Sequence, residues 1–143
     1  MRVSDVLRNK GDLVVTVRPE HSVTDLLDLL AEHGVGALVV SSDGRSVDGI
    51  VSERDVVRRL QQHGAALLDS PVSDIMTATV ATVGPDADLE DLMRQMTERR
   101  FRHLPVVDDD SHLVGIVSIG DVVKHRIEHL EVERDQLTAY ISS

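Results

Sequence analysis

An internal repeat constrains the fold of this chain more than any other feature of its sequence. At an offset of 66 positions, residues 49–58 lie on residues 115–124 without a gap, and both read Gly-Ile-Val-Ser-x-x-Asp-Val-Val followed by a basic residue. At the same offset, residues 16–19 and 82–85 share the pattern Thr-Val-x-Pro. A repeat of this period within 143 residues predicts a tandem of two similar structural units.

The repeats also indicate where the two units begin and end. Residues 3–7 lie on residues 72–76 at an offset of 69, so the first repeat carries three extra residues near residues 9–12. The organisation that follows is unit 1 over residues 1–66, unit 2 over residues 67–128 and a C-terminal helical extension over residues 129–143.

Hydrophobic periodicity and turn residues predict the order strand, helix, strand, strand, helix in each unit. After the first strand, the elements predicted in unit 1 are a helix over 22–33, strands over 37–40 and 47–51, and a helix from Ser52. Their counterparts in unit 2 are 88–99, 104–107, 113–117 and a helix from Ile119. A unit of roughly 60 residues buries too little surface to be stable alone, so we expect the two units to share one core across their sheets.

Composition excludes several classes of protein. The chain has no cysteine, which rules out a disulfide scaffold and a thiolate zinc site. Its net charge of -10 and its small aromatic content, Phe101 and Tyr140, argue against nucleic acid as a partner. Residues 1–11 lack the apolar run of a signal peptide, and no other run is long enough to cross a bilayer. We therefore expect a cytoplasmic protein without a membrane partner.

The motifs, taken in order and occurring twice, resemble a tandem pair of CBS domains. The resemblance covers about residues 3–128 and rests on the Gly-Ile-Val-Ser-x-x-Asp segments, on Asp-Ile-Met-Thr at 74–77 and on Arg-His-Leu-Pro-Val-Val-Asp at 102–108. It implies an α/β (α+β) fold of two β-α-β-β-α units packed as a pseudo-twofold pair. It also implies a free-standing regulatory module that binds adenosine-containing ligands, such as AMP, ATP, NAD or S-adenosylmethionine, in clefts between the units.

The Ser-x-x-Asp motif has two interpretations. A Ser at a strand-to-helix junction lies beside the free N–H groups of the first helical turn, and an Asp one turn later can accept both hydrogens of a ribose diol. The pairs Ser52 with Asp55 and Ser118 with Asp121 also fit capping boxes. Spacing alone favours the cap, whereas the resemblance favours ribose binding, and both roles can coexist.

A basic cluster at residues 99–103, Arg-Arg-Phe-Arg-His, indicates an anionic ligand in an otherwise acidic chain. Unit 1 has Gly36, Ala37 and Val39 where unit 2 has Arg102, His103 and Pro105, so we expect two unlike sites. The predicted strong nucleotide site has ribose on Asp121, phosphate near Ser118, Arg102 and His103, Arg54 as a further phosphate candidate, and adenine near Thr79, Val80 and Pro105. The second site, centred on Ser52 and Asp55, is expected to be weaker or empty.

Two other functional classes are an enzyme and an adaptor. Catalysis is not expected, because the one-turn pair His125 and His129 lacks the Glu of a zinc protease motif and is better explained as surface histidines. Neither a nucleophile elbow nor a Walker sequence is present, so we expect no metal and no catalytic cofactor. The alternative to a nucleotide sensor is an adaptor CBS pair that binds a target protein and no nucleotide.

The C-terminal segment predicts self-association. From Ile119 onward the chain has no proline, and its apolar residues recur at heptad-like spacing. This seam consists of Val123, Ile127, Leu130, Leu137 and Ile141, and only Arg134 breaks it. We expect one long helix and a homodimer that buries the seam, with a solvated tail as the alternative.

Overall fold

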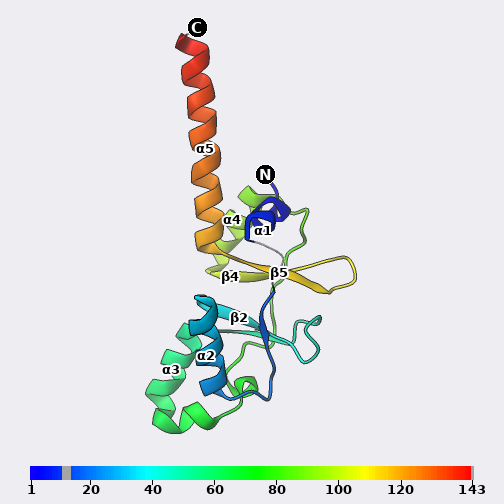
Figure 1. Cartoon of the computed structure of the whole chain (residues 1–143), viewed down its shortest axis with the longest axis vertical. Coiled ribbons are helices and arrows are strands. Elements are labelled where there is room, and N and C mark those ends of the chain that lie inside the picture. The colour runs from blue at the N-terminus through cyan, green and yellow to red at the C-terminus, as the bar shows by residue number, and fades with distance from the viewer. Residues whose placement is uncertain (11–13, 143) are drawn as a thin grey trace.

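The computed structural model describes residues 1–10 and 14–142, so part of the extra segment near residues 9–12 lies outside the described residues (Figure 1). The elements of the first half are α1 (Val3–Lys10), β1 (Thr16–Val17), α2 (Val23–His33), β2 (Ala37–Val40), β3 (Gly49–Ser52), α3 (Glu53–His63) and the 3₁₀ helix η1 (Gly64–Asp69). Those of the second half are the 3₁₀ helix η2 (Val72–Asp74), α4 (Leu89–Arg99), β4 (His103–Val107), β5 (Leu113–Ser118) and α5 (Ile119–Ser142).

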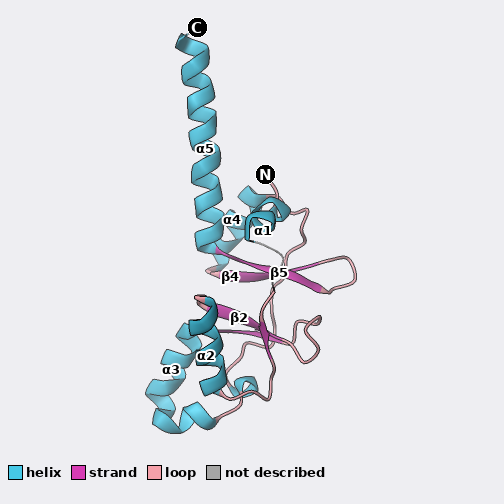
Figure 2. Cartoon of the chain, in the orientation of Figure 1, coloured by secondary structure: helices cyan, strands magenta, loops and turns pink. Residues whose placement is uncertain are grey.

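Two small sheets lie next to each other at the middle of the molecule, with helices on their outer sides (Figure 2). In unit 1, β2 pairs with β1 in parallel and with β3 in antiparallel fashion, and in unit 2, β4 pairs antiparallel with β5. The α+β fold expected from the sequence is confirmed. The helices are amphipathic and cover the sheets with apolar side chains, such as Leu26 of α2 and Leu92 of α4, which are almost completely buried.

The first strand expected in unit 2 is reduced to a single parallel bridge between Val83 and Val106. This bridge is the equivalent, 66 residues later, of the pairing between Val17 and Val40 in unit 1. Pro105 stands in β4 where β2 has Val39 and has no N–H to donate to a neighbouring strand. The proline therefore accounts for the shorter ladder.

The apolar interior consists of two clusters rather than the single shared core expected from the sequence. Val3 and Val6 of α1, which belong to the first repeat, are fully buried in the cluster of unit 2. Val72 and Ile75, their equivalents in the second repeat, are buried in the cluster of unit 1. We call residues 3–7 and residues 72–76 the leading segments of the two repeats. The leading segment of each repeat packs in the core of the other unit and completes that small core.

The exchange brings the end of each leading segment to the strand-to-helix junction of the opposite unit. Met76 packs against Gly49, where an added Cβ would lie 2.7 Å from its sulfur atom. Leu7 packs in the same way against Gly115, at 2.7 Å from such a Cβ. Residues near 10 and near 77 are therefore placed beside the two Ser-x-x-Asp motifs.

Helix α5 is the single long helix that the sequence predicts, and its second half projects away from both sheets (Figure 1). Within it, Val122 and His125 are buried, whereas the seam residues are between 40% exposed at Val123 and 80% exposed at Ile141. The burial of His125 corrects the interpretation of this histidine as a surface residue. No helix in the described part of the chain is long and apolar enough to span a membrane.

Candidate functional site

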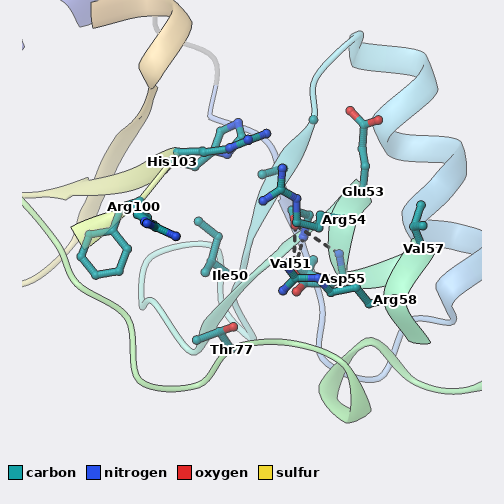
Figure 3. Close-up of a pocket in the computed structure, with 15 residues that line it drawn as sticks. Ile50, Val51, Glu53, Arg54, Asp55, Val57, Arg58, Thr77, Arg100 and His103 are labelled. Atoms are coloured by element: carbon teal, nitrogen blue, oxygen red, sulfur yellow. Dashed lines mark hydrogen bonds between the residues drawn. The ribbon is translucent and has the colours of Figure 1, made fainter. Parts of the chain in front are cut away.

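A cavity of about 770 Å³ lies between the two units (Figure 3). Its lining comes from both halves of the chain: Gly36, Ala37, Ile50, Val51, Ser52, Glu53, Arg54, Asp55, Val57, Arg58, Thr77, Arg100, Phe101, Arg102 and His103. Figure 3 shows Arg54, Asp55 and Arg58 at the start of α3, with Arg100 and His103 across from them on the other unit. The volume exceeds what a small anion needs and suits a ligand of nucleotide size.

One wall of the cavity is the capped N-terminus of α3. The Ser52 N–H donates to Asp55 Oδ2 at 2.8 Å, and the Asp55 N–H donates to Ser52 Oγ at 3.4 Å, which is the capping box that the sequence predicts. The Ser52 hydroxyl also donates to Asp55 Oδ2 at 3.1 Å. Among the described residues these bonds use only one carboxylate oxygen, so Asp55 Oδ1 retains its capacity to accept hydrogen bonds from a ligand.

Four arginines converge on the cavity: Arg54, Arg58, Arg100 and Arg102. None of them forms an ion pair with another described residue, although Glu53 and Asp55 line the same cavity. Cations gathered without partners repel one another and favour an anion between them. Guanidinium groups are also well suited to phosphate, because their planar donors can bind two oxygens at once.

Arg100 is held in a backbone conformation that disfavours an arginine. It ends α4 with φ 59° and ψ 33°, in the left-handed region, where its equivalent Gly34 ends α2 with φ 61°. A side chain other than glycine costs roughly 1 kcal/mol in this region. The retained arginine lines the cavity, which is the usual place for such strain to be tolerated.

The cavity regroups the residues that the sequence singled out. Of these, it is lined by Ser52, Arg54, Asp55, Arg102 and His103. Neither Ser118 nor Asp121 lines this cavity, although His103 is the strand partner of Ser118 and lies within reach of the charge of Asp121. The expected grouping of Arg102 and His103 with Ser118 and Asp121 therefore stays a prediction. The pseudo-twofold arrangement sets the start of β4 against the β3–α3 junction of unit 1, so a residue of one repeat faces the motif of the other.

The three residues expected beside an adenine also lie outside the cavity lining. Pro105 is buried in the middle of β4, where its carbonyl oxygen accepts a hydrogen bond from Val83 N–H at 3.1 Å. Thr79 is exposed and Val80 is partly buried in the connection between η2 and α4. The apolar part of the lining comes instead from Ile50, Val57 and Phe101.

Sequence reasoning missed two of the arginines. Arg58 was not singled out, although both repeats carry a basic residue at this position, Lys124 being its equivalent. Arg99 and Arg100 belong to the basic cluster at 99–103 but are not among the residues that the sequence predicts in the nucleotide site, and of the two only Arg100 lines the cavity. The signal that could have identified Arg100 is that the first repeat has a glycine, Gly34, at the equivalent end of its helix.

Asp121, the equivalent of Asp55, has different neighbours. It forms the second capping box, with Ser118 N–H donating to its Oδ2 at 3.0 Å and its own N–H donating to Ser118 Oγ at 3.1 Å. The same Oδ2 accepts a hydrogen bond from Lys10 Nζ at 2.7 Å. Burial alone would raise the pKa of Asp121, but the bonds from Lys10 and from Ser118 outweigh it and hold the pKa below its usual value.

A small group of possible metal ligands lies in the turn between β4 and β5. Asp108, Asp110 and His112 bring one ligand atom each to within 4.8 Å of one another. Asp108 Oδ1 accepts hydrogen bonds from the N–H groups of Asp110 at 3.0 Å and His112 at 2.9 Å. These bonds account for the cluster as an ordinary turn stabilised by an Asp side chain.

Comparison with known proteins decides the family. Residues 3–62 and residues 72–128 both match the family model described as CBS domain. The chain belongs to the CBS-domain family. Each of its two units is one CBS domain, and together they form a CBS pair.

Relatives of this CBS pair include proteins of the same simple architecture. The mitochondrial CBS domain-containing protein CBSX3 of Arabidopsis thaliana is 35% identical over 147 residues, which cover 97% of this chain and 71% of the relative. A crystal structure of a CBS-domain protein from Agrobacterium tumefaciens is 44% identical, with a TM-score of 0.82 over 88% of this chain and 99% of that one. CBSX2 of Arabidopsis thaliana, solved in complex with AMP, is 34% identical, with a TM-score of 0.73 over 89% of this chain and 96% of that one.

Titration of His103 is a testable consequence of the site's electrostatics. Burial lowers the pKa of this imidazole below its ordinary 6.5, the charges of Lys10 and Arg102 lower it further, and those of Asp121 and Glu53 oppose the shift. Between the lowered pKa and 6.5 the unfolded chain binds more protons than the folded one, so folding stability falls as the pH falls through this window.

We therefore predict that His103→Gln flattens the pH dependence of the free energy of unfolding, measured by urea denaturation between pH 7.5 and 5.5. Each pH unit between the folded and unfolded pKa values contributes at most about 1.4 kcal/mol. His112→Gln, at an exposed position, serves as the control. Equal slopes for wild type and His103→Gln would contradict the prediction.

Proposed function

We propose that this CBS pair is a regulatory module that binds one adenosine nucleotide in the cavity between Asp55 and Arg102, without catalysis. The observation that carries the proposal is the meeting of a ribose-type acceptor and four arginines, none of them ion-paired with another described residue, around one cavity of suitable size. The AMP complex of CBSX2, a relative at 34% identity, supports the choice of adenosine ligands.

The proposed pose follows the chemistry of the walls. The ribose diol donates to Asp55, where Oδ1 is available, and the phosphate lies near the N-terminus of α3 and the guanidinium groups of Arg54 and Arg102. The base packs between Ile50 and Phe101. The earlier candidates Ser118, Asp121, Pro105, Thr79 and Val80 have no part in this pose.

The charge of the lining favours anionic ligands. Four arginines against two carboxylates leave a local positive excess in a protein whose net charge is -10. Phosphate-bearing ligands such as AMP, ATP and NAD are therefore proposed over S-adenosylmethionine, whose sulfonium is cationic. The adaptor alternative, a CBS pair that binds a target protein and no nucleotide, gives no thermal stabilisation by any of these nucleotides. A bound nucleotide at 100 times its Kd adds about 2.7 kcal/mol.

A homodimer through α5 is the second part of the proposal. Leu130, Leu137 and Ile141 are 45%, 62% and 80% exposed on a helix that leaves the body of the molecule. Their heptad-like spacing suits pairing with the same helix of a second copy. The cytoplasmic location stays a prediction from the sequence.

Asp55→Ala should weaken AMP binding about 10- to 100-fold, because hydrogen bonds to a charged group contribute about 1.5–3 kcal/mol. Asp121→Ala is the matched control, since both changes remove the carboxylate of a capping box, and it should leave the affinity within about twofold of wild type. Isothermal titration calorimetry measures both. A larger loss with Asp121→Ala would restore the site assignment made from sequence alone.

Arg102→Ala should weaken the binding of AMP by a similar factor and leave that of adenosine nearly unchanged, because the lost partner is a phosphate. Arg99→Ala, which removes an arginine from outside the cavity lining, is the control. Competition against a fluorescent nucleotide compares the two ligands. Equal losses for AMP and adenosine would assign Arg102 to packing.

Replacing Leu130, Leu137 and Ile141 together by Gln should convert a dimer to a monomer in multi-angle light scattering. A chain that ends at His129 should behave in the same way, because both changes remove the apolar seam. Val57→Gln, at a position that is 66% exposed on α3, is the control. A monomeric wild type contradicts the dimer, and a dimer that survives both changes contradicts the role of α5.

A further inference from the structure

The leading segment of the first repeat places a cation against Asp121, the equivalent of Asp55. Lys10 Nζ donates to Asp121 Oδ2 at 2.7 Å and to the carbonyl oxygen of Ile116 at 3.0 Å. The two charged side chains are 35% and 25% exposed, so the pair is partly shielded from solvent. Lys10 thus touches the carboxylate that corresponds to Asp55.

The two clefts of the pair differ greatly in size. The cleft next to Asp55 has a volume of about 770 Å³, whereas the one lined by Lys10 and Ile116 has about 90 Å³. Three residues of the smaller cleft, Val35, Ala37 and Ile116, correspond to Phe101, His103 and Ile50 of the larger one at the offset of 66. Ser118 and Asp121, the equivalents of Ser52 and Asp55, do not line the smaller cleft. The smaller cleft lacks room for a nucleoside.

Packing of the leading segments does not explain this difference. Leu7 against Gly115 and Met76 against Gly49 are equivalent contacts of the same tightness, each at 2.7 Å from an added Cβ. Thr77, which follows Met76, lines the large cavity, so a leading segment packed in this way does not by itself fill a cleft. The feature without an equivalent is Lys10, near the three extra residues of the first repeat, because the positions that correspond to it at offsets of 66 and 69 are Met76 and Thr79.

We propose that Lys10 is an internal latch: its ammonium occupies the place of a ribose at Asp121, so that the pair holds a single nucleotide at Asp55. This inference rests on the proposed function. It explains why Asp55, in the described part of the chain, has no cationic partner while Asp121 has one.

The latched cleft fits a ligand of different chemistry. Arg54, Arg100 and Arg102 correspond to Gly120, Gly34 and Gly36, so the groups proposed to bind phosphate are missing there. Its lining is mainly apolar, with Val14, Val15, Val35, Ala37 and Leu38 among its residues. An opened cleft should therefore accept an uncharged nucleoside, adenosine, rather than a nucleotide.

The test uses variants of the full chain in a background without the first site. Asp55→Ala should bind adenosine too weakly to measure. The double variant Asp55→Ala with Lys10→Ala should have one adenosine site per chain, with an affinity for adenosine at least tenfold higher than that of Asp55→Ala. Adding Asp121→Ala to the double variant should remove this site. Arg8→Ala is the matched control, because Arg8 is a cation of the same helix that pairs with Asp5 instead.

Equilibrium dialysis with labelled adenosine and AMP gives the number of sites. Wild type should bind one AMP and no second ligand. Two AMP per wild-type chain, or no gain of adenosine binding with Lys10→Ala, overturns the latch while leaving nucleotide binding at Asp55 intact. Absence of AMP from the wild type contradicts the proposed function instead.

A second readout needs no ligand. Carboxyl carbon NMR should show that Lys10→Ala raises the pKa of Asp121, because the loss of the ammonium removes a bond that favours the charged carboxylate. Arg8→Ala should not change it. An unchanged pKa in Lys10→Ala overturns the contact on which the latch depends.

Discussion

The exchange of leading segments between the two repeats is the interaction on which the rest of this structure depends. A unit of this size has little apolar surface to bury, and each core is completed by valines or isoleucine from the other repeat. Val3 and Val6 enter the second unit, and Val72 and Ile75 enter the first. The exchanged segments hold the two sheets against each other. The clefts between the sheets are therefore part of the folded structure.

The same crossing decides which residues form a site. Arg102 and His103, at the start of β4, line the cavity at the capped helix of the first unit and also lie beside the start of α5 in their own unit. Each cleft is therefore built from a motif of one repeat and a wall of the other. The two walls differ in sequence, so that one cleft is basic and the other is mainly apolar, although both Ser-x-x-Asp motifs form a capping box.

Local features of this fold follow from the sequence, and the composition of the site does not. The repeat offset, the capping boxes at Ser52 and Ser118 and the length of α5 depend on neighbouring residues and could be predicted. The grouping of Arg102 with Asp55 depends on how two units pack, which an alignment of repeats within one chain does not contain. The effect of Pro105 was also not predicted from the repeat pattern. Its missing N–H reduces the first strand expected in unit 2 to a single bridge between Val83 and Val106.

The energetics of the two clefts differ because a ligand at Asp121 must displace a charge. A ribose hydroxyl and the Lys10 ammonium both donate to a charged carboxylate, in bonds of about 1.5–3 kcal/mol each, but only the ammonium also neutralises the charge of that carboxylate. At Asp121 the exchange of Lys10 for a ribose is therefore unfavourable. At Asp55 a ribose competes with no ammonium from the described residues and brings a phosphate to arginines that lack partners. In the proposed arrangement, Lys10 at Asp121 and the arginines near Asp55 together direct the ligand to Asp55.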